Sequence, residues 1–214
     1  MQKANIIKLS SPALLVSSAA VGTRKEREGP LGQYFDATED DVKFGMKTFE
    51  AGESEMQRIA FNLALAKAKM NSEAIGLLFA GDLLNQCTVS TKGLFEFDIP
   101  YLGLFGACST MAQGLLLGAL TVSAGYCGYA AAVTSSHFCA AERQFRFPLE
   151  YGGQRPPTAQ WTVTGAGVFI IAGKWSERRP AVTEVLPGRI VDYGITDAGN
   201  MGAAMAPAVG ILGQ

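Results

Sequence analysis

The chain has 214 residues, of which 48% are hydrophobic and 17% charged, and its formal net charge is -1 at pH 7. This composition predicts a well-cored globular body rather than a disordered chain, and it offers no basic face of the kind that nucleic-acid binding needs. Four cysteines without Cys-x-x-Cys spacing and a single histidine argue against a structural zinc site and suit a reducing cytoplasm.

The N-terminal segment resembles a signal peptide only superficially. Lys3 and Lys8 precede the apolar run 12–16, but that run is short and serines interrupt it. We therefore expect an N-terminal strand, followed by a loop over 22–48. No segment of the sequence reaches the roughly 18 apolar residues that a membrane-spanning helix needs.

Helix and strand patterns alternate through the middle of the chain. A helix is expected over 54–70, where Ser54 and Gln57 have the spacing of a capping box. The continuous apolar run 75–80 predicts a strand that is covered on both faces, and a further helix is expected over 85–94. This alternation is typical of an α/β layered fold.

Cys108 is the first candidate site residue. It stands between the strand-like run 100–105 and the helix-length run 111–124, which is rich in small residues. Unpaired N–H groups and the helix dipole at a helix start favour a thiolate and hold anionic ligand atoms. We therefore expect the thiol at the bottom of a pocket. The alternative is that Cys108 is a small buried hydrophobe, as cysteines outside disulfides often are.

Two further candidates stand at the carboxyl end of the buried strand that is expected over 129–136. Ligands of open α/β sheets bind beyond the carboxyl ends of the strands, and Ser136 and His137 stand at that point. They are therefore candidate ligand-binding residues. The alternative for His137 is a structural role, with its ring hydrogen-bonded inside the protein.

The segment 138–160 carries mixed charges and aromatic residues, and we expect a long loop that forms a pocket wall. Arg143 and Arg146 are its candidate ligand-binding residues, unless they form ion pairs with neighbouring glutamates. The segments 161–172 and 181–191 then look like two antiparallel strands joined by a charged turn.

Two other motifs have simpler interpretations. Asp82 and Asn85, which follow the strand over 75–80, are expected to cap the next helix rather than face a pocket. The run Gly165-Ala166-Gly167 lies in a strand-rich segment without a following Lys-Ser or Lys-Thr, so it is expected to serve close backbone packing rather than phosphate binding.

Several unusual motifs follow one another in an order that resembles one known family. The motifs are Glu28 to Gly32, Ala80 to Gln86, Phe105 to Thr110, Ser135 to His137, Ala141 to Pro148, Glu150 to Gln154, Gly188 to Asp192 and Met201 to Pro207. From about residue 12 onward, the chain resembles the stage V sporulation protein AD family of spore-forming Firmicutes.

The resemblance implies an α/β, thiolase-like fold, built in that family from two similar βαβαβαββ halves that pack against shared central helices. Residues 1–214 match the N-terminal half, so we expect a single domain with a mixed five-stranded sheet, without the C-terminal half. In catalytic thiolases and ketoacyl synthases the nucleophile stands at the position that Cys108 matches. The basic histidine and the second cysteine or asparagine come from the half that is absent.

The same resemblance implies a non-catalytic sporulation protein that binds dipicolinic acid (pyridine-2,6-dicarboxylic acid), for its uptake into the forespore and its release in spore germination. It implies a homodimer in the cytoplasm, peripheral to the spore inner membrane, that acts with the other proteins of the stage V sporulation A operon. No catalytic residue, cofactor, metal or nucleic acid is expected. The residues expected to bind the planar dianion are Cys108, Ser136, His137, Arg143 and Arg146.

Two alternatives stay open. One is an acyltransferase of the thiolase or ketoacyl synthase type, with Cys108 as the nucleophile. The other is a purely structural partner protein, whose subunits pair through an exposed edge strand and the layer that contains Cys108.

Overall fold

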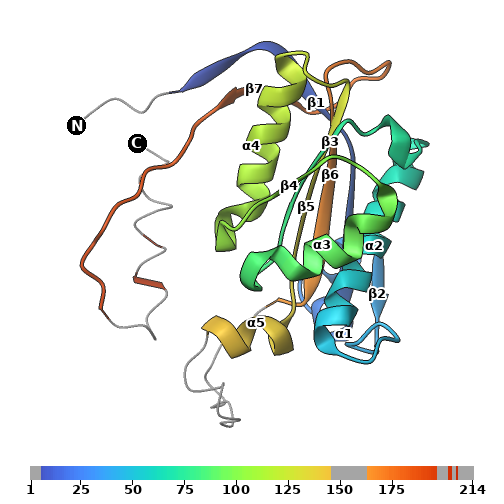
Figure 1. The fold of residues 1–214 in the computed structure, drawn as a ribbon, viewed down its shortest axis with the longest axis vertical. Helices are drawn as coiled ribbons and strands as arrows, with labels where there is room; N and C mark the ends of the chain where they lie inside the picture. The colour runs from blue at the N-terminus through green and yellow to red at the C-terminus, as the bar shows by residue number, and fades with distance from the viewer. Residues whose placement is uncertain (1–5, 146–162, 197–201, 204–205, 207–214) are drawn as a thin grey trace.

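The computed structural model describes residues 6–145, 163–196, 202–203 and 206, and in them a seven-stranded sheet lies between helices (Figure 1). The strands are β1 (Ile7–Thr23), β2 (Ala37–Glu39), β3 (Leu77–Gly81), β4 (Tyr101–Gly103), β5 (Tyr129–Ser136), β6 (Gly165–Ala172) and β7 (Ala181–Val185). The α-helices are α1 (Arg24–Arg27), α2 (Phe49–Ala68), α3 (Thr88–Leu94), α4 (Thr110–Ser123) and α5 (Phe138–Phe145). Among these described helices, none has the length and apolar character needed to cross a membrane.

The sheet is mixed, with strand order β2-β1-β6-β5-β3-β4, and β7 also pairs with β1. Strands β3, β4 and β5 are parallel to one another, whereas β6 is antiparallel to both β5 and β1. The expected five-stranded mixed sheet is therefore present as β1-β6-β5-β3-β4, and β2 and β7 extend it beside β1. The carboxyl ends of β3, β4 and β5 all meet at one edge of the sheet.

The two faces of the sheet carry different helices. Helix α2 packs on one face and α4 on the other, as Figure 1 shows. Strand β5 serves both, because Ala131 and Val133 belong to the core under α2 while Ala130 and Ala132 belong to the core under α4. The continuous apolar run that predicted a doubly covered strand therefore has the expected cause.

Helix α2 begins at Phe49, earlier than the predicted start at Ser54. Thr48 is its N-cap, and the Thr48 hydroxyl accepts a hydrogen bond of 3.1 Å from the N–H of Ala51. The predicted capping box of Ser54 and Gln57 is wrong, since both residues are buried inside the helix. Gly52 hid the true start, because glycine disfavours a helix; here a Cβ at Gly52 would lie 2.7 Å from the Lys43 carbonyl oxygen.

Two expectations about the second half of the chain are wrong. Residues 138–145 form helix α5 rather than a loop, while 146–162 lie outside the described residues. Strands β6 and β7 do not form a hairpin. Both are antiparallel to β1, which is 17 residues long and pairs through Leu14 with Ala172 of β6 and with Ala181 of β7. The expected strand over 181–191 ends at Val185.

Candidate functional site

The candidate site residues gather at the edge where the parallel strands end, which we call the carboxyl edge. Asp82 follows β3, Cys108 follows β4 by a short turn, and His137 follows β5. Strand β6 begins at the same edge, because Ser136 of β5 is paired with Gly165 of β6. The topology therefore brings together residues that are far apart in the sequence, as the α/β pattern predicts.

The turn before Cys108 is fixed by a close approach of two backbone segments. Leu104 donates its N–H to the carbonyl oxygen of Ala80 at 2.8 Å. A Cβ at Gly81 would lie 1.9 Å from the Leu104 carbonyl oxygen, so only glycine fits there. Ala107 then takes a left-handed conformation with φ of 47°. Such strained non-glycine residues concentrate at functional sites, and this one directly precedes Cys108.

Cys108 lies in the 3₁₀ turn η5 (Ala107–Ser109), directly before α4, which confirms its expected place at a helix start. Its side chain is exposed, so the alternative of a buried hydrophobe is wrong. The expectation of a thiol at the bottom of a pocket is also wrong for the part of the chain that the structure describes. The reason is that the turn projects from the sheet edge, where the neighbouring Ala107 and Ser109 are exposed too.

The start of α4 has no side-chain cap. Ser109 occupies the N-cap position, but its hydroxyl donates to the Gly106 carbonyl oxygen at 2.7 Å instead of accepting from the helix. The Thr110 hydroxyl likewise donates to the Ala107 carbonyl oxygen, at 2.8 Å. In the described part of the chain, no side-chain hydroxyl accepts from the start of α4, although the Thr110 N–H is bonded to the Ala107 carbonyl oxygen across the preceding 3₁₀ turn. Backbone N–H groups at a helix N-terminus favour an anion.

His137 is fully buried, and both of its ring nitrogens take part in hydrogen bonds. Nε2 lies 2.8 Å from the Val42 carbonyl oxygen, and Nδ1 accepts from the N–H of Cys139 at 3.1 Å. Because a carbonyl only accepts, the proton sits on Nε2. The ring also stacks on Phe138. This geometry is what the structural alternative predicts, and a ligand bond from His137 stays a prediction that requires the bond to Val42 to break.

Burial lowers the pKa of His137, and the Val42 carbonyl and the carboxylates of Glu50 and Glu26 only partly oppose this. The ring is therefore neutral at pH 7. Since a neutral imidazole adds no positive charge, the carboxyl edge does not attract an anion through His137 in this state.

The other three candidates differ in what the structure describes. The Ser136 hydroxyl donates to the Val163 carbonyl oxygen, which ties the end of β5 to the segment before β6. Arg143 belongs to α5, of which only the backbone is described at that position, and Arg146 lies outside the described residues. Their roles in ligand binding stay predictions.

A chain of buried polar side chains, which the sequence did not reveal as a unit, crosses the carboxyl edge. Its members are Glu53, Gln57, Asp82, Ser90 and Ser135, and we call it the buried polar chain. Ser135 donates to Glu53 at 2.7 Å, and the Gln57 amide donates to Ser135 at 2.7 Å and to Ser90 at 3.0 Å. Ser90 donates to Asp82 at 2.7 Å. The one sequence signal was the spacing of Glu53 and Gln57, which places them on one face of a helix.

Asp82 has the predicted capping role. Its carboxylate accepts from the N–H groups of Leu84, at 2.9 Å, and of Ser90, at 2.8 Å. Ser90 lies in the first turn of α3, so Asp82 satisfies an N–H group that the helix itself leaves unpaired. The side chain of Asn85 lies outside the described residues.

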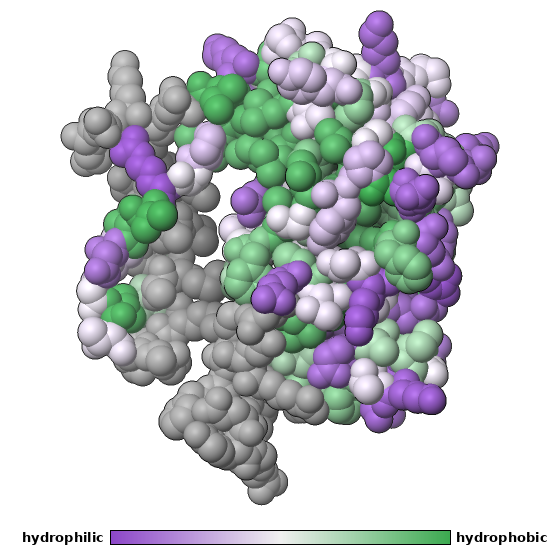
Figure 2. Space-filling model, in the orientation of Figure 1, coloured by the Kyte–Doolittle hydropathy of each residue, from purple (hydrophilic) through white to green (hydrophobic). Residues whose placement is uncertain are grey.

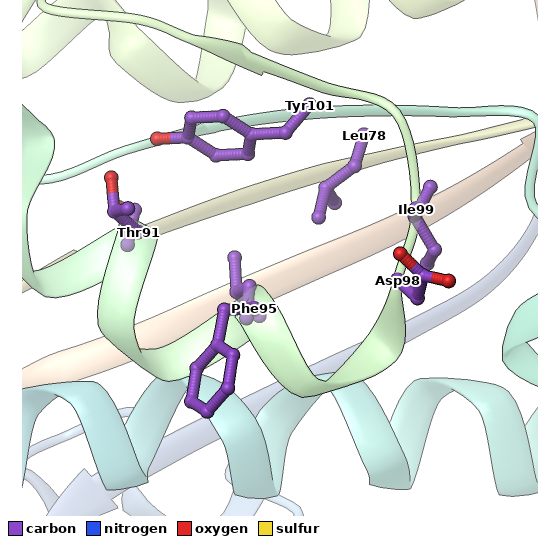
Figure 3. A pocket seen from close by; sticks show the side chains of 8 residues that line it. Leu78, Thr91, Phe95, Asp98, Ile99 and Tyr101 are labelled. Atoms are coloured by element: carbon purple, nitrogen blue, oxygen red, sulfur yellow. The ribbon is translucent and has the colours of Figure 1, made fainter.

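A cavity of about 170 Å³ lies between α3, β4 and the segment that joins them, on the α2 face of the sheet. It is lined by Leu78, Ser90, Thr91, Leu94, Phe95, Asp98, Ile99 and Tyr101. Figure 3 shows Tyr101 and Thr91 at one end, Asp98 and Ile99 at the other, and the Phe95 ring turned away. Burial raises the pKa of Tyr101 to about 12, so its hydroxyl is protonated at pH 7. Among the described residues, no group of three or more side chains is arranged to hold a metal ion.

Comparison with known proteins identifies relatives across nearly the whole chain. The model of the family described as stage V sporulation protein AD matches residues 3–211. Stage V sporulation protein AD of Bacillus subtilis (strain 168) is 42% identical over 197 residues, which cover 92% of this chain and 58% of that protein. The chain therefore spans little more than half the length of this relative.

Comparison with solved structures places the fold. The H285N variant of OleA from Xanthomonas campestris superposes with a TM-score of 0.51 at 16% identity, over 78% of this chain and 57% of that one. The 3-oxoacyl-[acyl-carrier-protein] synthase III of Aquifex aeolicus VF5 gives 0.52 at 11% identity, over 77% and 55%. The expected thiolase-like fold is confirmed, and at these identities the likeness concerns the fold alone.

Proposed function

Because the chain belongs to the stage V sporulation protein AD family, we propose that this sporulation protein binds dipicolinic acid at the carboxyl edge and does not catalyse a reaction. The observation that carries the proposal is the uncapped start of α4 beside the exposed thiol of Cys108. Backbone N–H groups at this place suit one carboxylate of the ligand.

The ligand chemistry fits a site shared between two elements. Dipicolinate is a flat dianion, and each carboxylate needs its own donors, while the ring needs an apolar surface. In the proposed arrangement one carboxylate binds at the start of α4, near Cys108. The second carboxylate binds Arg143, which belongs to α5 directly after β5, or Arg146, which lies outside the described residues. Ser136 contributes a hydroxyl if it exchanges its bond to Val163 for one to the ligand.

Isothermal titration calorimetry with dipicolinate tests the proposal. We expect saturable heat for the chain, an affinity about fivefold weaker for Cys108→Ala from the loss of about 1 kcal/mol, and a larger loss for Arg143→Ala because its bond would be charge-assisted. Cys127→Ala is the matched control, since Cys127 precedes β5 at the opposite edge. No heat at millimolar dipicolinate would reject the proposal, and an unchanged affinity would remove that residue from the site.

The proposed biological role is uptake of dipicolinic acid into the forespore and its release in germination, together with the membrane proteins of the same operon. Placing the Cys108→Ala and Arg143→Ala variants in the sporulating host tests this role. We expect spores with less dipicolinate, measured by terbium fluorescence of spore extracts. Normal dipicolinate content in spores that contain only a non-binding variant would contradict it.

We also propose that the chain forms a homodimer through β4. In the described residues, β4 lies at one edge of the sheet. Leu102, within β4, and Phe105, shortly after it, are 51% and 55% exposed. Unpaired edges with apolar side chains favour strand pairing, and a lysine on such an edge opposes it. Leu102→Lys is therefore expected to convert a dimer into a monomer in light scattering after size exclusion. A wild-type monomer at high micromolar concentration would contradict the proposal.

An acyltransferase remains the second candidate, and the exposure of the Cys108 thiol at a helix start is the observation that favours it. Mass spectrometry of the chain after incubation with acyl-CoA separates the two functions. An acyl adduct on Cys108 that turns over to a condensed product would establish catalysis and overturn the binding-only proposal. The absence of an adduct would reject the acyltransferase.

A further inference from the structure

The buried polar chain contains two carboxyl groups that are both 1% exposed, those of Glu53 and Asp82. A buried carboxylate is costly unless hydrogen-bond donors surround it. Asp82 has three donors: the N–H groups of Leu84 and Ser90 and the Ser90 hydroxyl. Glu53 receives the hydroxyl of Ser135. Among the described residues, the network therefore supplies three hydrogen-bond donors to Asp82 and one to Glu53.

Gln57 shows where the network is incomplete. Its amide nitrogen donates to Ser90 and to Ser135, which uses both of its hydrogens. Its carbonyl oxygen Oε1 is buried and has no donor. Turning the amide over does not help, because the protons of Ser90 and Ser135 already go to Asp82 and Glu53. An acceptor in this position destabilises the folded state if it stays unpaired.

The missing donor is one helical turn away. Glu53 and Gln57 are at positions i and i+4 of α2, where side chains on a helix meet. We propose that Glu53 is a neutral carboxylic acid whose O–H is donated to Oε1 of Gln57, so that one bound proton closes the buried polar chain and locks α2 to the ends of β3 and β5. Each member of the chain then has a partner, and Asp82 alone carries charge.

The burial and the charges around Glu53 also favour its neutral form. Burial, opposed by the Ser135 hydrogen bond and helped by the carboxylates of Asp82 and Glu50, raises the pKa of Glu53 to about 8. On the β5 side His137 is neutral. Strands β1 and β6 present apolar residues to the core under α2. Helix α5, which also packs against α2, carries Glu142 and Arg143.

This proton-dependent connection of α2 to the ends of β3 and β5, which we call the lock, goes beyond the proposed function, because it needs no ligand. Ser135 of the chain directly precedes Ser136, so loss of the proton loosens the end of β5 at the carboxyl edge. A group whose pKa is raised on folding binds its proton more tightly in the folded state. Folding stability therefore falls as the pH rises from the ordinary value of 4.5 to about 8, and levels off above it.

Urea unfolding between pH 5 and 9.5 tests the proposal with Glu53→Gln. The new amide can accept from Ser135 and donate to Gln57 without a proton to lose, so we expect its unfolding midpoint to be higher than wild type at pH 9 and to have lost the fall between pH 5 and 8. Glu73→Gln, on an exposed residue, is the matched control and should keep the wild-type slope. A Glu53→Gln variant with the wild-type slope, or one less stable than wild type at pH 9, would overturn the proposal.

Infrared spectroscopy gives a second readout that does not depend on the variant folding. Wild-type protein at pH 7 is expected to show the carbonyl band of a protonated carboxyl group, which titrates away with a midpoint near 8. The band should persist in Glu73→Gln and vanish in a folded Glu53→Gln. Wild-type protein without this band at pH 7 would show Glu53 ionised and would refute the lock.

Discussion

The two helices that cover the sheet differ in the side chains that they turn away from it. Helix α2 turns polar side chains outward, where Arg58 forms ion pairs with Glu55 and Glu96. Helix α4 contains no charged residue, and its leucines are only partly buried against the core beneath. Figure 2 shows hydrophobic residues gathered on the surface in the upper part of the view, where α4 lies in Figure 1.

The two faces of the sheet are therefore stabilised in different ways. On the α2 face, the helix buries its apolar side against the sheet and turns its polar side to water. The α4 face leaves apolar side chains at the surface, as proteins do where another surface binds. The helix that follows the candidate ligand residue Cys108 is thus the one that leaves apolar side chains at the surface.

The largest effect is expected from truncating a core residue on the α2 side. Phe61 is fully buried and meets Phe97 edge to face, with ring centroids 4.7 Å apart. Phe61→Ala should destabilise the protein by about 3–5 kcal/mol in urea unfolding. Leu116→Ala on α4 should cost only about 1 kcal/mol, since that side chain is only partly buried. Equal losses for the two variants would show that α4 is as well packed as α2.

A smaller effect is expected from glycines that allow close packing on the α4 side. An added Cβ at Gly81 meets the Leu104 backbone, whereas at Gly118 it meets the flexible end of the Ile171 side chain at 2.4 Å. Gly81→Ala should therefore cost about 1–3 kcal/mol. For Gly118→Ala, the gain of about 1 kcal/mol in helix propensity offsets the crowding. Thermal unfolding of both variants checks the order, and a more costly Gly118→Ala would contradict it.

A charge on the outer side of α4 should change association more than stability. Leu116→Glu is expected to lower the free energy of unfolding by about 1 kcal/mol, as Leu116→Ala does, because both lose the same partly buried contacts. It should lower self-association and binding of hydrophobic dyes, measured by sedimentation velocity and fluorescence. Asn62→Glu, on the exposed polar side of α2, is the control and should leave both unchanged.

The smallest effect on stability is expected at Cys108. Cys108→Ser should change unfolding by less than about 0.5 kcal/mol, since the side chain is exposed. Its thiol should also be the first to react with iodoacetamide. Cys87 should react slowly, because it is 5% exposed, hydrogen-bonded to the Leu104 carbonyl, and burial raises its pKa. Peptide mass spectrometry over time gives the order, and a faster Cys87 would contradict it.

Local patterns predicted the fold well where packing is uniform. The run 129–136 coincides with β5, because a strand covered on both faces needs apolar residues at every position. The helix after Cys108 was equally clear. The pairing of β7 with β1 was not clear from the sequence, because it depends on the length of β1 and not on any turn near β7. In the same way, the start of α2 was hidden by a glycine that the Lys43 backbone requires.

The candidate site was predictable in position but not in environment. The rule for strand ends correctly placed Cys108 and His137 at one edge. Whether each side chain is exposed depends on distant segments, such as Val42, whose carbonyl oxygen lies within hydrogen-bond distance of His137. The buried polar chain was missed for a related reason, because glutamate, glutamine and serine look like surface residues until the elements that carry them come together.

Dipicolinate binding at the carboxyl edge beside Cys108 is tested most directly by protection of this thiol from alkylation. Saturating dipicolinate should slow the reaction of Cys108 with iodoacetamide and leave the rate at Cys127, at the opposite edge of the sheet, unchanged. Pyridine-2-carboxylate, which has one carboxylate, should protect less. A Cys108 rate that is the same with and without dipicolinate would contradict the account.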